Sequence, residues 1–153
     1  MKKLLIYILT AFTVLTLPAS AKIPASQRIR LTDQWEYLKG DLGSIWEAVR
    51  AVAPGSSEAV PIWQPVTLPH CFNAEDAVDP DVNYYQGPGW YRTLLDIQNP
   101  AANGRTILEF EGAGQKTEVY IYTRKVGSHV GGYDEWSLSL IHISEPTRPL
   151  YIS

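Results

Sequence analysis

The chain has 153 residues, a formal net charge of −3 and one cysteine, Cys71. This length allows one domain with a real core, the charge leaves no basic footprint for nucleic acid, and a single thiol excludes an intramolecular disulfide. Five tryptophans and nine tyrosines against three phenylalanines suit sheets and polar-faced pockets, because indole N–H and phenol O–H groups can pair while the rings pack.

The first 21 residues carry the features of an export signal. A short positive region at 2–3 precedes an almost wholly apolar run at 4–17, and Pro18 separates that run from the A-x-A cleavage pattern of 19–21. A retained membrane anchor is the alternative, but the run falls short of the roughly 20 residues that span a bilayer. We therefore expect a signal peptide over 1–21, a mature chain that starts at Lys22 without a membrane anchor, and a secreted or periplasmic protein.

Apolar residues at every second position predict short strands along the rest of the chain. In chain order, the predicted elements are strands at 28–31 and 35–38, one or two helical turns at 45–52, an extended segment at 63–68, a long polar connection at 71–89, and strands at 90–97, 106–111, 117–123 and 125–130. Prolines confine 63–68 to a sheet edge or a loop. Many short strands with little helix predict an all-β, antiparallel sandwich. Its predicted core residues are Leu95, Ile97, Leu108, Phe110, Val119 and Ile121.

Three local patterns suggest ligand sites and are better explained otherwise. The glycine pair of 112–116 lacks the Lys-Ser/Thr pair of a phosphate loop, so a tight strand connection is expected. The acidic start of 79–90 resembles a calcium loop, but its sixth and twelfth positions are Tyr84 and Trp90 rather than Gly and Glu. His70 has no second spaced pair of zinc ligands, so we expect a hydrogen-bonding loop residue. No metal and no cofactor is predicted.

The segment NYYQGPGWYR, residues 83–92, is the strongest candidate for a binding function. Sugars are recognised by aromatic rings together with polar groups that fix the hydroxyls, and ligand pockets combine these two elements. Trp90 and Tyr91 already fit a strand alternation, which favours a role in the core. Asn83 and Tyr84 lie in the preceding loop, and we predict that these two residues contact substrate.

Several motifs of the chain resemble glycoside hydrolase family 2. They are WEYLKGDLGSIWEA, LPHCFNAEDA, YYQGPGWYR and EFEGAGQKTEVYIYTRKVGSHVGGYDEW. Together they are similar to the amino-terminal sugar-binding domain of exported β-galactosidase-like enzymes, over about 27–136. One departure is the hairpin before KVG, where family members often carry Asn-Gly. Tyr122-Thr123-Arg124 stands there instead, so we expect a turn that is longer or of another type.

The resemblance implies a galactose-binding-like jelly roll at 22–136, incomplete in this chain, followed in the full enzyme by an immunoglobulin-like domain and a (β/α)₈ barrel. It also implies retaining hydrolysis by two glutamates about 5 Å apart. Both would lie in the barrel, so no catalytic residue is expected here. The acidic residues at 75, 76, 79 and 81 are better explained as a solvated loop than as a catalytic pair.

Residues 137–153, SLSLIHISEPTRPLYIS, do not continue the pattern of the preceding domain. LSLIHISEPTR is identical to the translation of a transposase sequencing adapter, and the last five residues fit the index and the end of that adapter. A natural strand that ends in a proline-rich stop is the alternative. We interpret 137–153 as an artefactual, adapter-derived tail that does not belong to the native domain.

The tail nonetheless carries a strand-like pattern. Its apolar alternation allows 138–143 to pair with any open sheet edge. From Glu145 onward the chain should leave the sheet, because Pro146 and Pro149 lack an N–H.

These observations give one functional interpretation and one alternative. We expect the amino-terminal part of an exported glycoside hydrolase, whose partners are a carbohydrate substrate and the missing carboxyl-terminal domains of the same chain. In that enzyme this domain would help to shape the substrate pocket. The alternative is a non-catalytic carbohydrate-binding module or adhesin on the same jelly roll, because a fold alone does not fix a function. The choice among β-galactosides, β-glucuronides and β-mannosides stays open.

Overall fold

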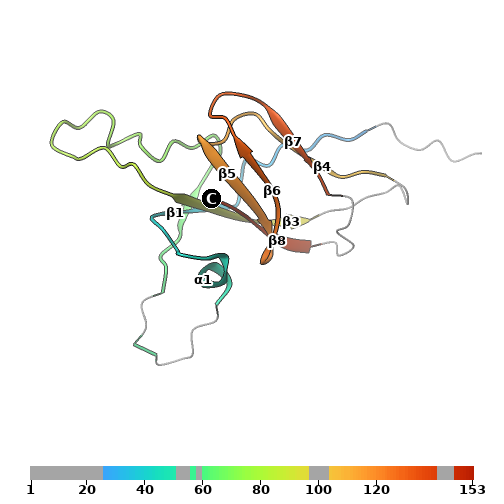
Figure 1. Cartoon of the computed structure of the whole chain (residues 1–153), viewed down its shortest axis with the longest axis horizontal. Coiled ribbons are helices and arrows are strands. Elements are labelled where there is room, and N and C mark those ends of the chain that lie inside the picture. The colour runs from blue at the N-terminus through green and yellow to red at the C-terminus, as the bar shows by residue number, and fades with distance from the viewer. Residues whose placement is uncertain (1–25, 51–55, 58–59, 97–103, 141–146) are drawn as a thin grey trace, which may run out of the picture.

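The computed structural model describes residues 26–50, 56–57, 60–96, 104–140 and 147–153 (Figure 1). The predicted signal peptide, the predicted mature start and Ile97 of the predicted core lie outside these ranges. Within them, no helix has the length and apolar character to cross a membrane.

The described residues form strands and one short helix. In chain order they are β1 (Trp35–Lys39), α1 (Ile45–Val49), β2 (Gln64–Val66), β3 (Gly89–Asp96), β4 (Ile107–Phe110), β5 (Lys116–Ile121), β6 (Arg124–Val130), β7 (Trp136–Ser139) and β8 (Thr147–Ile152). All the strand pairs are antiparallel, which confirms the predicted all-β class.

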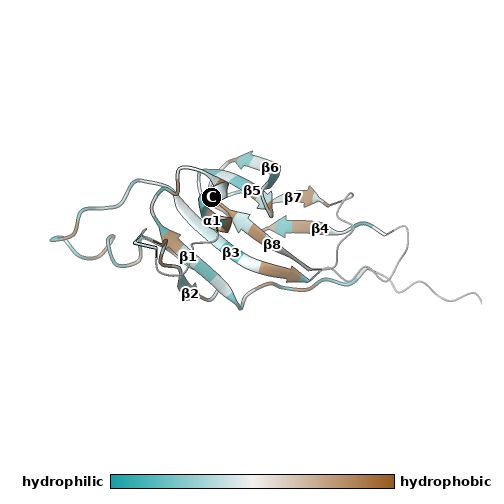
Figure 2. Cartoon of the chain, turned by 90° about the horizontal axis from the view of Figure 1, so that it is seen from below, coloured by the Kyte–Doolittle hydropathy of each residue, from teal (hydrophilic) through white to brown (hydrophobic). Residues whose placement is uncertain are grey.

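The strands form two sheets (Figures 1 and 2). The larger sheet has six strands in the order β2-β1-β3-β8-β5-β6, and β4 pairs with β7 in a second, two-stranded sheet. β2 is an edge strand, as its prolines predict. Apolar stretches on β4, β7 and β8 are visible in Figure 2.

The main core lies between the two sheets, and every second residue of the strands contributes to it. Its buried members are Trp35, Leu95, Leu108, Val119, Ile121, Leu140 and Leu150. Four of the six predicted core residues are among them. Phe110 is only partly buried but packs against this cluster, where its ring stacks on Trp136 with a centroid separation of 4.1 Å.

The opposite face of the large sheet carries α1. Ile45 and Ala48 of this helix pack with Trp90 and Tyr151 from β3 and β8. The apolar residues of α1 therefore have a partner, and a helix this short depends on such packing because isolated short helices are marginal in water. The result is a sandwich with a helical cover on one outer face.

The strand predicted at 28–31 is wrong. Residues 26–32 have no strand conformation, and Ile29 is 68% exposed. Arg28 and Arg30 form ion pairs with Glu109 and Glu111 beside β4. At the end of the segment, the carbonyl groups of Leu31 and Thr32 accept hydrogen bonds from Trp35 Nε1 and the Leu68 N–H. The alternation of 28–31 reflects exposed arginines rather than a buried apolar face.

The hairpin between β5 and β6 differs from the expectation of a longer turn. Ile121 pairs with Arg124, which leaves Tyr122 and Thr123 as a two-residue connection. Tyr122 has φ of 56° and Thr123 is not among the residues with positive φ, whereas an Asn-Gly type I′ turn needs positive φ at both positions. The turn is thus not longer than an Asn-Gly turn but is of another type, and this was one of the two outcomes expected from the sequence.

The structure corrects the prediction that the chain leaves the sheet from Glu145 onward. Residues 147–152 form β8, which lies between β3 and β5 near the middle of the large sheet. Leu150 is 1% exposed and Tyr151 5%. The proline argument failed because Pro149 removes only one donor and lies just beyond the β5–β8 ladder, opposite the Tyr122 turn, so that β3 alone pairs with it there. The pairing expected for 138–143 is confirmed at Leu138 and Ser139, which pair with β4 as part of β7, whereas 141–143 lie outside the described residues.

Candidate functional site

The connection between β2 and β3 is the candidate site, and it extends away from the sheet (Figure 1). At its base, the rings of Tyr37, His70, Phe72 and Tyr91 form one cluster. Tyr37 lies 5.1 Å from His70 and 4.8 Å from Tyr91 between ring centroids, and 6.1 Å from Phe72. His70 Nδ1 and the Tyr91 hydroxyl are hydrogen-bonded at 2.9 Å. His70 is therefore the hydrogen-bonding loop residue that was predicted.

Burial in this cluster affects the two tyrosines. It raises the pKa of Tyr91 to about 12, with a smaller contribution from Cys71, and it raises the pKa of Tyr37 further. Both phenols are therefore neutral at physiological pH. The two uncharged phenols belong to a cluster of rings that joins the loop to β1 and β3.

A buried carboxylate fixes the middle of the loop. Asp76 is 8% exposed and accepts hydrogen bonds from Lys39 Nζ at 2.5 and 2.8 Å. It also accepts from Asn73 Nδ2 and from the Tyr85 N–H, each at 3.2 Å. Asn73 Nδ2 donates in addition to the Tyr85 carbonyl at 3.0 Å. These bonds join both arms of the loop to the end of β1.

The Lys39 hydrogen bond is the main cause that lowers the pKa of Asp76 below its ordinary value, and the Tyr85 N–H adds to it. Asp76 is therefore ionised at neutral pH, which suits a carboxylate that only accepts hydrogen bonds. Its burial corrects the expectation of a wholly solvated acidic loop. Glu75, Asp79 and Asp81 are exposed as expected.

The second arm of the loop has its own brace. The Tyr85 hydroxyl donates to the Pro88 carbonyl at 2.9 Å, and Lys39 Nζ lies 5.1 Å from the centre of the Tyr85 ring. A Cβ at Gly87 would lie 2.4 Å from the Tyr85 hydroxyl oxygen, so a larger residue there would displace the Tyr85 ring. The GPG sequence therefore allows the chain to pass close under Tyr85 before β3 begins.

Asn83 and Tyr84, the predicted substrate contacts, lie beyond these braces. Both are exposed, with Tyr84 at 58%, and the neighbouring Val78 and Val82 are 80% and 48% exposed. The loop thus has a fixed base and presents amide, phenol and apolar groups to solvent. Trp90 and Tyr91, by contrast, belong to the interior: Trp90 is 5% exposed and Tyr91 packs against the main core. Trp90 and Tyr91 thus have the core role that the sequence predicted, whereas the substrate contact of Asn83 and Tyr84 stays a prediction.

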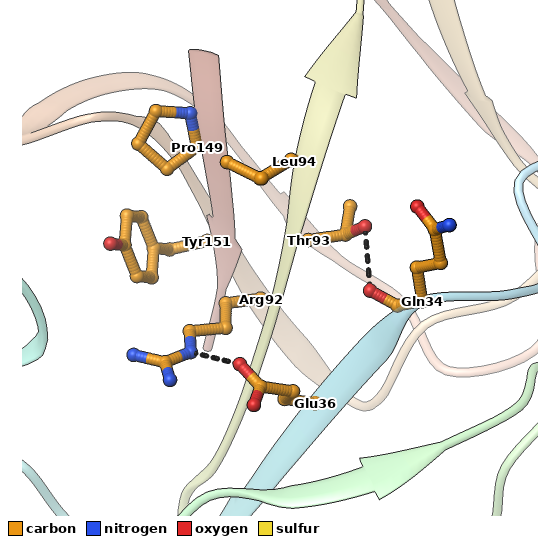
Figure 3. A pocket seen from close by; sticks show the side chains of 7 residues that line it. All are labelled: Gln34, Glu36, Arg92, Thr93, Leu94, Pro149 and Tyr151. Atoms are coloured by element: carbon orange, nitrogen blue, oxygen red, sulfur yellow. Dashed lines mark hydrogen bonds and ion pairs between the residues drawn. The ribbon is translucent and has the colours of Figure 1, made fainter.

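Apart from the loop, a hollow lies on the face of the large sheet that carries α1 (Figure 3 shows the residues that line it). It has a volume of about 310 Å³ and is lined by Gln34, Glu36, Arg92, Thr93, Leu94, Pro149 and Tyr151. Arg92 Nε donates to Glu36 Oε2 at 2.6 Å, and the guanidinium lies 4.2 Å from the centre of the Trp63 ring. Because Glu36 offsets the charge of Arg92, this pair is a cross-strand brace rather than an anion site.

Sequence reasoning missed both charged pairs. Glu36 and Arg92 face each other in the β1–β3 register, a contact that depends on which strands pair. Lys39 and Asp76 are 37 positions apart, and no local pattern marks either residue. The described residues contain no group of three or more His, Cys, Asp or Glu side chains that could hold a metal ion.

Comparisons with known proteins point to one class of enzyme. The crystal structure of Parabacteroides merdae β-glucuronidase is 67% identical, with a TM-score of 0.73, over 81% of this chain and 18% of that one. Bacteroides uniformis β-glucuronidase 3 is 57% identical, with a TM-score of 0.75, over 85% of this chain and 18% of that one. The β-glucuronidase of Bacteroides fragilis is 37% identical over 68 residues, which are 44% of this chain and 10% of that protein.

These relatives are glycoside hydrolases, and the chain matches only a small part of each. It spans less than a fifth of their length. No family model matches the chain. The fold is a β-sandwich domain similar to one in the β-glucuronidase structures.

Proposed function

We propose that the chain is the amino-terminal domain of an exported glycoside hydrolase of family 2 that cleaves β-glucuronides. The observation that supports this most directly is the 67% identity to a β-glucuronidase over 81% of the chain. The proposal replaces a β-galactoside with a β-glucuronide as the favoured substrate, because the relatives reported above are named β-glucuronidases.

In this proposal the domain positions substrate and does not perform the chemistry. The loop between β2 and β3 supports that role, because its base is fixed by Asp76 and the aromatic cluster while Asn83 and Tyr84 remain exposed. Because the base of the loop is already fixed, substrate binding would lose less conformational entropy than it would with a mobile loop. The exposed tip would form part of the rim of a pocket whose two carboxylates lie in a barrel domain.

The proposal also covers the signal peptide at 1–21 and the adapter-derived residues at 137–153. Residues 1–21 would be removed on export to the periplasm or the exterior, and 137–153 would derive from a sequencing adapter rather than from the gene. The test is to recover the uninterrupted gene, express the full protein and compare hydrolysis of nitrophenyl β-D-glucuronide, β-D-galactoside and β-D-mannoside. Preferred turnover of the glucuronide is expected. Binding to polysaccharide without hydrolysis would instead support the carbohydrate-binding module.

The role of the loop needs a separate measurement in the full enzyme. Tyr84→Ala and Asn83→Ala should each raise KM for the preferred glycoside with a smaller change in kcat, since lost positioning contacts that form before the chemical step weaken binding. Val78→Ala, which alters an exposed loop residue that is not predicted to bind, is the matched control. Unchanged KM in both test variants would remove Asn83 and Tyr84 from the site.

A further inference from the structure

Rings from three different strands stack where β4, β6 and β7 lie side by side (Figures 1 and 2). The Trp136 indole of β7 stacks on Phe110 of β4, with 4.1 Å between ring centroids and 7° between ring planes. It also stacks on His129 of β6, at 5.0 Å and 15°. The His129 imidazole is therefore held in a fixed position against β7.

Asp134 lies in the connection between β6 and β7 (131–135) and is the polar partner of this imidazole. Its Oδ2 lies 2.8 Å from His129 Nε2, and the two side chains are 56% and 22% exposed. A Cβ at Gly131 would collide with the Asp134 carboxylate, so a larger residue there would displace it. The Gly131 N–H donates to the Gln115 carbonyl at 3.0 Å. The connection is thus attached to the sheet by its backbone at Gly131 and through the imidazole at Asp134.

The other charged residues of the neighbouring elements do not share this contact. The partner of His129 on β5 is Thr117, which carries no charge, and side chains alternate between the two faces of a strand. Lys116 and Glu118 therefore point to the opposite face, where Lys125 Nζ lies 2.8 Å from Glu118 Oε1. Beside Phe110, the charged groups are paired with one another, as Arg28 with Glu109 and Arg30 with Glu111. β7 contains no charged residue, and Glu135 of the connection is exposed.

The charge of the imidazole decides how strong the attachment at Asp134 is. Histidine is the side chain that changes charge between about pH 5 and 8, whereas aspartate is ordinarily ionised throughout that range. A neutral imidazole can still donate its Nε2–H, but a protonated one forms a charge-assisted hydrogen bond, which is roughly twice as strong. The positive ring is also attracted by the face of the Trp136 indole. Mild acid therefore strengthens the contact, and a rise in pH weakens it.

We propose that His129 and Asp134 form an acid-strengthened latch on the connection between β6 and β7. The latch holds 131–135 closed while His129 is protonated, and the connection opens more often as the imidazole loses its proton. Tyr133, which is fully exposed in this connection, is the side chain whose position the latch controls. The inference goes beyond the proposed function and does not rest on it, because the latch consists of residues of this chain that precede the adapter-derived tail.

The experiment measures hydrogen exchange of the Gly131 amide in the full chain by NMR, as a protection factor corrected for the intrinsic effect of pH. This amide reports the latch because its bond to the Gln115 carbonyl breaks when the connection opens. In the same samples, the ring protons of His129 report its protonation. Asp134→Asn removes the charge and keeps the shape of the side chain, and Glu135→Gln removes the adjacent carboxylate as the matched control. Both positions are exposed, and far-UV circular dichroism checks that both variants fold.

Protection of the Gly131 amide in the unmodified chain should be about three-fold higher at about pH 5.5 than at about pH 8, on the scale of an exposed ion pair. The change should follow the His129 ring signal, persist in Glu135→Gln and disappear in Asp134→Asn. Equal protection at both pH values in the unmodified chain would overturn the latch, and so would a change that Asp134→Asn retains. A change that Glu135→Gln also abolished would assign the effect to the overall charge of the connection and would equally overturn it.

Discussion

Leu150 is 1% exposed, and its truncation to alanine measures whether β8 occupies the sheet in solution. The side chain lies in the main core with Val119, which is fully buried. Burying a leucine contributes about 1.5–3 kcal/mol, and a cavity adds to the loss because the surroundings relax only partly. Leu150→Ala should therefore lower the free energy of unfolding by about 3 kcal/mol, within the range for buried leucines.

The assay is equilibrium unfolding in urea of the full chain and its variants, followed by tryptophan fluorescence. Leu94→Ala is the matched control, because Leu94 lies on the adjacent strand β3 opposite Pro149 and is 68% exposed. This control should change the free energy of unfolding by less than about 0.5 kcal/mol. If Leu150→Ala lowered the free energy of unfolding no more than Leu94→Ala, β8 would not be part of the folded sheet in solution.

Three further results are expected. The pKa of Asp76 is lowered in the folded chain, so its contribution to the free energy of unfolding is complete above the ordinary carboxyl pKa and is lost as pH falls through the lowered value. Asp76→Asn should remove this acid dependence and speed proteolysis of the loop. A pH profile of stability that Asp76→Asn leaves unchanged would contradict the hydrogen-bond network of Asp76. Tyr122→Gly should raise stability by about 1 kcal/mol by relieving positive φ, measured by urea unfolding; a loss would show that the Tyr122 side chain matters more. The chain alone should not hydrolyse nitrophenyl glycosides, and turnover above a mock preparation would refute its accessory role.

The strands in which apolar residues recur at every second position could be predicted from the sequence. Alternation located β1, β3, β4, β5 and β6 within a few residues, and the glycines and prolines marked the long connection before β3. The failures came where the partner of a segment decides the outcome. Residues 28–31 alternate but have no strand beside them to pair with, whereas β8 contains a proline but has a strand on each side.

The arrangement of the candidate site could be predicted only in part. The ring and amide composition of 83–92 marked Asn83 and Tyr84, and both are exposed. Their contact with substrate stays a prediction. The support of the loop could not be found, because Asp76 looks like any residue of a solvated acidic loop until the fold brings Lys39 to it. Buried ion pairs between distant residues depend on topology, which a single sequence specifies only through the packing of the whole domain.

The origin of residues 137–153 and their packing are separate questions. An adapter match concerns where the codons came from, whereas pairing in a sheet requires only backbone groups and an alternating apolar pattern. LYIS meets that requirement at the one place in the described sheet where two strand edges face each other. The burial of Leu150 and Tyr151 is therefore no argument by itself that 147–152 evolved in this sheet.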